Sequence, residues 1–128
     1  MDDQFQGKKT VKMDGKGRVS IPATFRRVLE LHDPARPEGE GASLYIAHYE
    51  ADPFLTCMTA TARADLAARI RAMHLGDPRR TALEEFLYEN IEETRLDPTG
   101  RLVLPKYLRD HAGLDGDVVF GGGGDLFR

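Results

Sequence analysis

An internal repeat constrains the fold of this chain more than any other feature of its sequence. Residues 13–31 (MDGKGRVSIPATFRRVLEL) and 96–114 (LDPTGRLVLPKYLRDHAGL) align without a gap at a constant offset of 83 residues. The identical pairs are Asp14/Asp97, Gly17/Gly100, Arg18/Arg101, Pro22/Pro105, Arg26/Arg109 and Leu31/Leu114. Turn residues, apolar alternation and proline stay in register, which predicts two copies of one supersecondary unit.

Each copy is predicted to form a tight turn between two short strands, followed by a helix. The second turn, 97–100 (DPTG), has the residue preferences of a type I turn. Gly17 and Gly100 can adopt the left-handed conformation that a bulged hairpin loop requires. The apolar alternation that follows each turn predicts that Arg18 and Arg101 face away from the core, at the tip of the hairpin. Each proline then ends a strand and starts a helix.

Further elements are predicted outside the two copies. The runs at 44–49 and 118–120 are typical of strands. Between the copies, an apolar stripe at helical spacing predicts a helix; its members are Ala62, Leu66, Ile70 and Met73. Asp77-Pro78 should end this helix, and Thr81 with Glu84 is a candidate capping box for a second one.

The duplication suggests how the chain builds a core. One unit has too few strands to bury its own apolar face, whereas two units can pair about a pseudo-twofold axis and close a small barrel. We therefore predict an α+β fold, a duplicated β-barrel with short helices in the insert between the repeats. The expected organisation is a first repeat at 8–55, a helical insert at 56–91 and a second repeat at 92–128.

Charge is distributed unevenly along the chain. The net charge is −3, yet the segment 8–27 carries seven basic residues against one acid, which makes it +6. The compensating acids concentrate between residues 82 and 94, where five glutamates occur without a base. This asymmetry suits a protein that presents one basic face to a nucleic acid, although two ordinary solvated faces would also explain it.

Several other classes of protein are disfavoured. No run approaches the roughly 20 apolar residues of a membrane span, and the acidic start of the chain does not resemble a secretory signal. The single cysteine, Cys57, favours a reducing cytoplasmic setting. The histidines are scattered and no nucleophile motif occurs, so we expect no metal, no cofactor, no small-molecule substrate and no enzymatic activity.

The twin motifs DGKGRVSIPATFR and DPTGRLVLPKYLRDHAGL resemble the paired signature of the MraZ family, whose members contain two SpoVT/AbrB-type modules. The resemblance implies an AbrB-like, swapped-hairpin barrel, a ring-shaped homo-oligomer and a nucleoid-associated transcription regulator. It also implies binding to short direct repeats in double-stranded DNA upstream of the division and cell-wall gene cluster. In that family the Asp-x-x-x-Arg motif contacts DNA, a role that carries onto Asp14 to Arg18 and onto Asp97 to Arg101.

The candidate DNA-binding residues are Asp14, Lys16, Arg18, Arg101, Lys12, Lys9 and Arg26. The arginine fork suits guanine O6 and N7 or a phosphate, whereas a lysine suits a phosphate. A structural alternative for Arg18 is a cross-turn ion pair with Asp14, and for Arg26 and Arg109 a structural pairing role. Because the second copy is less basic, we expect the first copy to dominate binding.

Two other functions compete with that of a DNA-binding regulator. An AbrB-type module can act like an antitoxin, which neutralises a partner protein; the duplication within one chain argues against this alternative, since antitoxins normally carry one copy. An uncharacterised enzyme would need a pocket with converging titratable groups, and the sequence indicates none.

Overall fold

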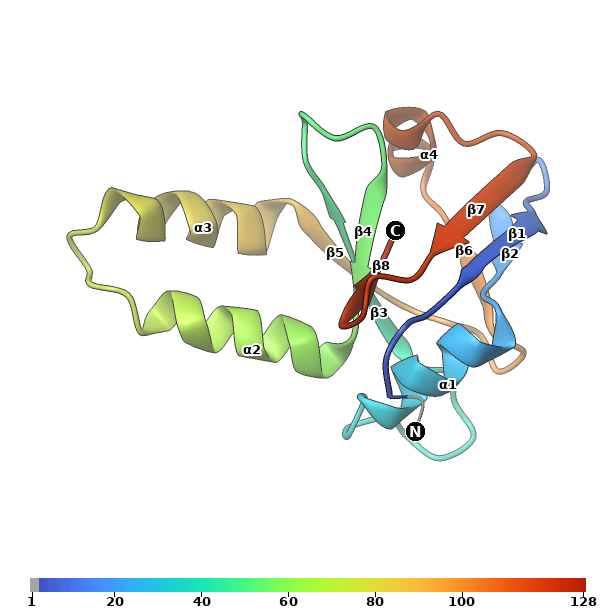
Figure 1. The fold of residues 1–128 in the computed structure, drawn as a ribbon, viewed down its shortest axis with the longest axis horizontal. Coiled ribbons are helices and arrows are strands. Elements are labelled where there is room, and N and C mark those ends of the chain that lie inside the picture. Colours follow the sequence, from blue (N-terminus) through green and yellow to red (C-terminus); the bar gives the residue numbers. More distant parts are fainter. Residues whose placement is uncertain (1–2) are drawn as a thin grey trace.

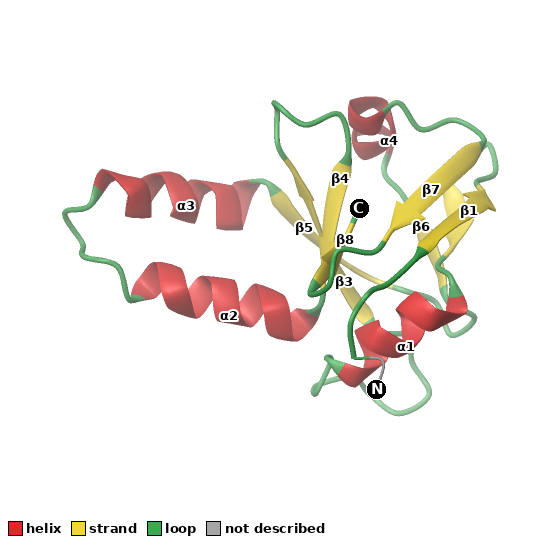
Figure 2. Cartoon of the chain, viewed as in Figure 1, coloured by secondary structure: helices red, strands yellow, loops and turns green. Residues whose placement is uncertain are grey.

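The computed structural model describes residues 3–128 as an α+β chain (Figures 1 and 2). Its elements are, in order, β1 (Lys8–Lys12), β2 (Arg18–Ser20), α1 (Ala23–Leu31), β3 (Ser43–His48), β4 (Leu55–Met58), α2 (Ala60–Arg71), α3 (Pro78–Glu89), β5 (Ile91–Arg95), β6 (Arg101–Val103), α4 (Lys106–Ala112), β7 (Asp117–Gly121) and β8 (Leu126–Phe127). The predicted α+β class is confirmed. Both predicted strands outside the repeats are found, as β3 and β7.

The strands of the two repeats are exchanged rather than paired within each repeat. The first strand of each copy pairs antiparallel with the strand that follows the other copy, β1 with β7 and β5 with β3. The second strands, β2 and β6, pair with each other. A twofold relation between the repeats would produce this pattern. The pairing of β1 with β7 is then equivalent to that of β5 with β3, and β2 pairs with its own counterpart, β6.

The predicted closed barrel is not formed. Within residues 3–128 the strands make three separate antiparallel sheets: β1–β7, β2–β6 and β5–β3–β4–β8. The β2–β6 ladder spans only three residues in each strand, since Pro22 and Pro105 follow closely and have no N–H to donate. Strands this short cannot bridge the sheets into one continuous cylinder.

The main core lies between these sheets and the two repeat helices, α1 and α4. At its centre Phe25 of α1 has no exposed surface and packs against three other phenylalanine rings, Phe5, Phe120 and Phe127. The centroid distances from Phe25 are 5.1–6.3 Å, within the range of favourable tilted and edge-to-face contacts. Through Phe5 and Phe127, both ends of the described chain pack against the helix of the first repeat.

The insert forms a helical arm, α2 and α3, that projects from the strands (Figure 1). Its own small core contains Ala67, Ile70 and Leu87. The predicted helix is found as α2, but the predicted capping box is wrong: α3 begins at Pro78, and Asp77 Oδ1 accepts the N-terminal hydrogen bond from Arg79 N. Proline suits a first helical position, because the N–H that it lacks would be unpaired there.

The strands β4 and β8 were not predicted. The division at 8–55, 56–91 and 92–128 stays a prediction. Among the helices of residues 3–128, none has both the length and the apolar character that crossing a bilayer requires.

Candidate nucleic-acid interface

Each Asp-x-x-x-Arg motif is a tight turn organised by its aspartate. Asp14 Oδ1 accepts hydrogen bonds from the backbone N–H groups of Lys16 and Arg18, each at 2.9 Å. Asp97 Oδ1 accepts the equivalent bonds from Thr99 and Arg101, also at 2.9 Å. Short polar side chains stabilise turns in this way, by replacing a backbone acceptor. The predicted left-handed glycines are confirmed, with φ of +83° at position 17 and +84° at position 100.

The other carboxylate oxygen of each aspartate holds the arginine of the same motif. Arg18 Nε lies 2.6 Å from Asp14 Oδ2, and Arg101 Nε lies 3.1 Å from Asp97 Oδ2. About half of each arginine side chain remains exposed, 49% and 54%. Within residues 3–128, the Nη nitrogens of these two arginines make no hydrogen bond. The cross-turn ion pair is therefore real, and it leaves the two-pronged end of each guanidinium open to a ligand.

These contacts lower the pKa of both aspartates from 3.8 to about 2. For Asp14 the largest cause is the hydrogen bond from the backbone of Arg18, followed by the bond from its side chain. For Asp97 the largest cause is the backbone bond from Arg101, followed by the hydroxyl of Thr99. Hydrogen bonds to the ionised form stabilise it, so both turns carry a firmly charged carboxylate at neutral pH.

The β2–β6 ladder brings the two motifs onto one surface. Val19 and Leu102 pair at its centre and point into the core, at 2% and 3% exposure. Their neighbours point outward, so Arg18, Ser20, Arg101 and Val103 form the exposed face. Arg18 is opposite Val103 and Arg101 is opposite Ser20. The arginines are thus diagonal neighbours, for which the usual separation is about 7–8 Å.

The three candidate lysines lie outside the β2–β6 ladder. Lys16 is exposed within the first turn, and Lys9 and Lys12 are exposed on β1. Lys9 lines a cavity of about 400 Å³ together with Thr24 and Arg27 of α1. Of these three lysines, Lys16 shares the turn of Arg18, whereas Lys9 and Lys12 lie on the neighbouring strand β1, paired with β7.

Arg26 occupies a different setting from the other candidates. Its Nη1 donates a 2.9 Å hydrogen bond to the carbonyl oxygen of Thr99, in the turn of the second repeat. The structural pairing role that the sequence left open for this residue is therefore present. Arg109 makes a related contact, from its Nε to the carbonyl oxygen of Leu104 at 3.1 Å.

Three residues at this surface are not among those predicted from the sequence. Ser20 and Val103 share the exposed ladder face with the arginines, and Val103 is 59% exposed. Thr99 holds Asp97 through its hydroxyl, at 2.7 Å, and also accepts the bond from Arg26. The alternation of inward and outward side chains that exposes the arginines also predicts that positions 20 and 103 face outward. Their pairing with the arginines depends on the register between β2 and β6, which the sequence does not specify.

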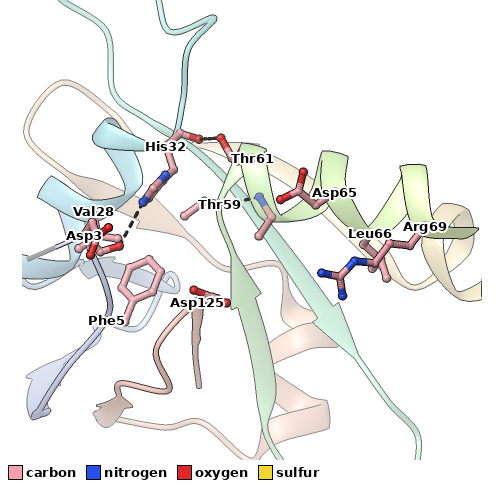
Figure 3. Close-up of a pocket in the computed structure, with 11 residues that line it drawn as sticks. Asp3, Phe5, Val28, His32, Thr59, Thr61, Asp65, Leu66, Arg69 and Asp125 are labelled. Atoms are coloured by element: carbon pink, nitrogen blue, oxygen red, sulfur yellow. Dashed lines mark hydrogen bonds between the residues drawn. The ribbon is translucent and has the colours of Figure 1, made fainter.

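A cavity of about 280 Å³ lies elsewhere, between α1, the start of α2 and the two terminal segments of the described chain (Figure 3). His32 Nε2 lies 3.1 Å from the carbonyl oxygen of Asp3, and its own carbonyl accepts a 3.0 Å bond from Thr61 Oγ1. These bonds connect chain segments, and none of the seven candidate residues lines the cavity. The cavity is therefore separate from the candidate interface.

Comparison with known proteins gives a consistent result. Residues 4–36, which include the first turn, match the family described as "MraZ protein, putative antitoxin-like". The whole chain is 40% identical over 129 residues to the transcriptional regulator MraZ of Ruegeria sp. (strain TM1040), covering 77% of that protein. It is 38% identical over 122 residues to that of Cereibacter sphaeroides (strain ATCC 17025 / ATH 2.4.3), covering 95% of the chain and 72% of the relative. By this identity and coverage, the chain belongs to the MraZ family.

Proposed function

We propose that this chain is a transcription regulator that binds specific sequences of double-stranded DNA through the exposed face of the β2–β6 ladder. The observation that carries the proposal is the register of that ladder, which makes Arg18 and Arg101 diagonal neighbours on one surface. The names of the relatives, transcriptional regulators, support the same conclusion.

The shape of the ladder fits the DNA major groove. A two-stranded β-ribbon can enter that groove, where base edges present a distinct pattern for each base pair. The Nη ends of Arg18 and Arg101 suit guanine O6 and N7, and the exposed methyl groups of Val103 suit a thymine methyl. Asp14 and Asp97 do not contact DNA in this proposal; they hold the arginines in place.

In this proposal, exposed lysines of the first repeat supply attraction that does not depend on the DNA sequence. Lys9, Lys12 and Lys16 are all exposed and belong to the basic segment 8–27. Contacts with phosphates fix the register of a protein on DNA, whereas contacts with base edges specify the sequence. The chain carries no cofactor or catalytic group in this function, and relatives named as regulators agree with a protein that is not an enzyme.

A single ladder makes few contacts, so one copy of the chain should bind weakly. We propose that a ring-shaped homo-oligomer presents several ladders to tandem direct repeats, on DNA of the nucleoid. Linked binding sites gain about 10²–10⁴ in apparent affinity when their geometry allows simultaneous contact. Changing the spacing of the repeats by half a helical turn should remove this gain, and an unchanged affinity would exclude multivalent binding.

The main test is a salt-titrated binding assay on DNA from upstream of the division and cell-wall genes. Arg18→Ala and Arg101→Ala should each weaken binding by about 1–3 kcal/mol per contact if the arginines read bases. A matched control is Arg79→Ala, because Arg79 is also exposed and paired with an aspartate, but lies on the helical arm. The control should bind like the wild type.

Salt dependence gives a second readout. The logarithm of the wild-type affinity should fall with the logarithm of salt concentration, with a slope near −0.9 for each phosphate neutralised. If both arginine variants retain wild-type affinity, the ladder face is not the DNA-binding surface. If the wild type binds no DNA under any salt condition, the antitoxin-like alternative becomes the better hypothesis.

A further inference from the structure

We infer that Arg26 is a positioning residue that holds the second Asp-x-x-x-Arg turn in its DNA-binding geometry, although it belongs to the first repeat. The inference rests on the proposed function, because it assigns Arg26 a role in the DNA-binding surface. It makes the orientation of Arg101 depend on a residue that lies 75 positions earlier in the chain.

The contacts of Arg26 converge on that turn. Its Nη1 donates to the carbonyl oxygen of Thr99 at 2.9 Å, the residue before Gly100. The guanidinium and Cδ also lie directly over Gly100, where an added Cβ would collide with the Cδ, Nη1 and Nε atoms of Arg26. Gly100 in turn accepts a 3.0 Å hydrogen bond from the backbone N–H of Ile21. The first repeat therefore contacts this turn through the side chain of Arg26 and through the backbone N–H of Ile21.

Arg26 is half-buried, which disfavours a direct contact of its guanidinium with DNA. Its Nε is shielded from solvent and has no hydrogen-bond partner within residues 3–128. Arg18 and Arg101, by contrast, are about half exposed, and their Nη atoms make no hydrogen bond to any described residue. An arginine whose Nε is buried against a turn is better suited to stabilising that turn than to binding a phosphate.

The equivalent arginine of the second repeat provides an internal comparison. Arg109 lies over Gly17, where an added Cβ would be 2.8 Å from its Nε. Its Nε donates to Leu104 of its own repeat rather than to the turn of the other repeat. The two arginines therefore differ: Arg26 binds the opposite turn by packing and by a hydrogen bond, whereas Arg109 contacts the opposite turn by packing.

This difference predicts a directional coupling. Removing the guanidinium of Arg26 should loosen the turn that carries Arg101 and leave the turn that carries Arg18 nearly unchanged. Arg26→Met is a suitable variant, because methionine keeps an unbranched apolar stem but has no donor. Arg71→Met controls for the loss of one charge, since Arg71 is exposed on α2 and lies on the helical arm.

The experiment combines backbone amide NMR of the free protein with a double-mutant cycle for DNA affinity. In Arg26→Met, the amide resonances of residues 99–101 should shift more than those of residues 16–18. Arg26→Met should weaken DNA binding by about fivefold, both in the wild type and in the Arg18→Ala background. In the Arg101→Ala background its effect should shrink to less than roughly twofold, because the residue that it positions is gone.

The other outcomes contradict either the positioning role of Arg26 or the proposed DNA-binding function. Unshifted amides at 99–101 would overturn the inference, whatever the DNA assay gives. An equal loss of affinity in all three backgrounds, together with a salt slope reduced by about one phosphate, would overturn it in favour of direct contact. Shifted amides in a protein whose wild type binds no DNA would leave the positioning role supported and refute the proposed function. Arg71→Met should leave the amides of both turns in place.

Discussion

Val19 of the first repeat pairs with Leu102 of the second, and these two residues occupy the same position in their repeats, 83 residues apart. A residue can pair with its own counterpart only where a twofold relation passes between the two strands. Both side chains are buried, so this pair connects the outward-facing arginines to the core. Substitutions at the pair should therefore affect both motifs together.

The first prediction concerns this central pair. Val19→Thr keeps the shape of the side chain but places a hydroxyl in the core, where an unpaired polar group costs about 1–3 kcal/mol. Val103→Thr is the control, because Val103 lies on the same ladder and is 59% exposed. Chemical denaturation should show a lower free energy of unfolding for Val19→Thr alone. Equal stability of the two variants would contradict the placement of Val19.

The second prediction separates close packing from backbone strain. Gly100→Ala requires a left-handed alanine, at a φ of +84°, and brings its Cβ against Arg26. Gly113→Ala has a similar strain, at a φ of +63°, but nothing lies within 4 Å of its Cβ. Strain alone costs roughly 1–2 kcal/mol, so Gly100→Ala should lose clearly more stability than Gly113→Ala. Gly15→Ala, with open space and no positive φ, should be nearly neutral.

The third prediction is the acid titration of the two turns. The pKa of Asp14 and Asp97 falls from 3.8 in the unfolded chain to about 2 in the folded protein. A lowered pKa means that the stabilisation is complete above pH 3.8 and is lost as the pH falls through about 2. Carboxyl carbon NMR should therefore show both aspartates still ionised at a pH of about 3.

Asp14→Asn provides the matched test of the charge. The amide keeps an oxygen that can accept the backbone bonds but removes the ion pair with Arg18. We expect the pH dependence of the first turn to disappear in this variant while that of the second turn persists. A wild-type titration near 3.8 at both sites would show that the turn hydrogen bonds do not form in solution.

The fourth prediction concerns Cys57, which is 8% exposed. Burial raises the pKa of its thiol to about 12, so almost no thiolate exists at neutral pH. A thiol reagent such as iodoacetamide should leave the native protein unmodified and should label it rapidly in denaturant. Labelling of the native state at the rate of a free thiol would place Cys57 at the surface instead.

Much of the local structure was predictable because the determinants are close together in the sequence. The turn at Asp97 follows from its residue order, and the left-handed glycines follow from the absence of a Cβ. The start of the second arm helix was predicted wrongly, at a capping box of Thr81 and Glu84, because proline can begin a helix as well as end one. Here it begins α3, and Asp77 caps the helix.

The sequence by itself determined that the chain is duplicated, that each copy carries a turn with an outward arginine, and that positive charge concentrates near the first copy. Those features depend on neighbouring residues and on the period of the repeat. Only the tertiary structure decided that β2 pairs with β6, that Arg26 reaches Thr99, and that the sheets do not close into a barrel. Strand pairing and side-chain reach depend on contacts between residues far apart in the chain, which local preference does not specify.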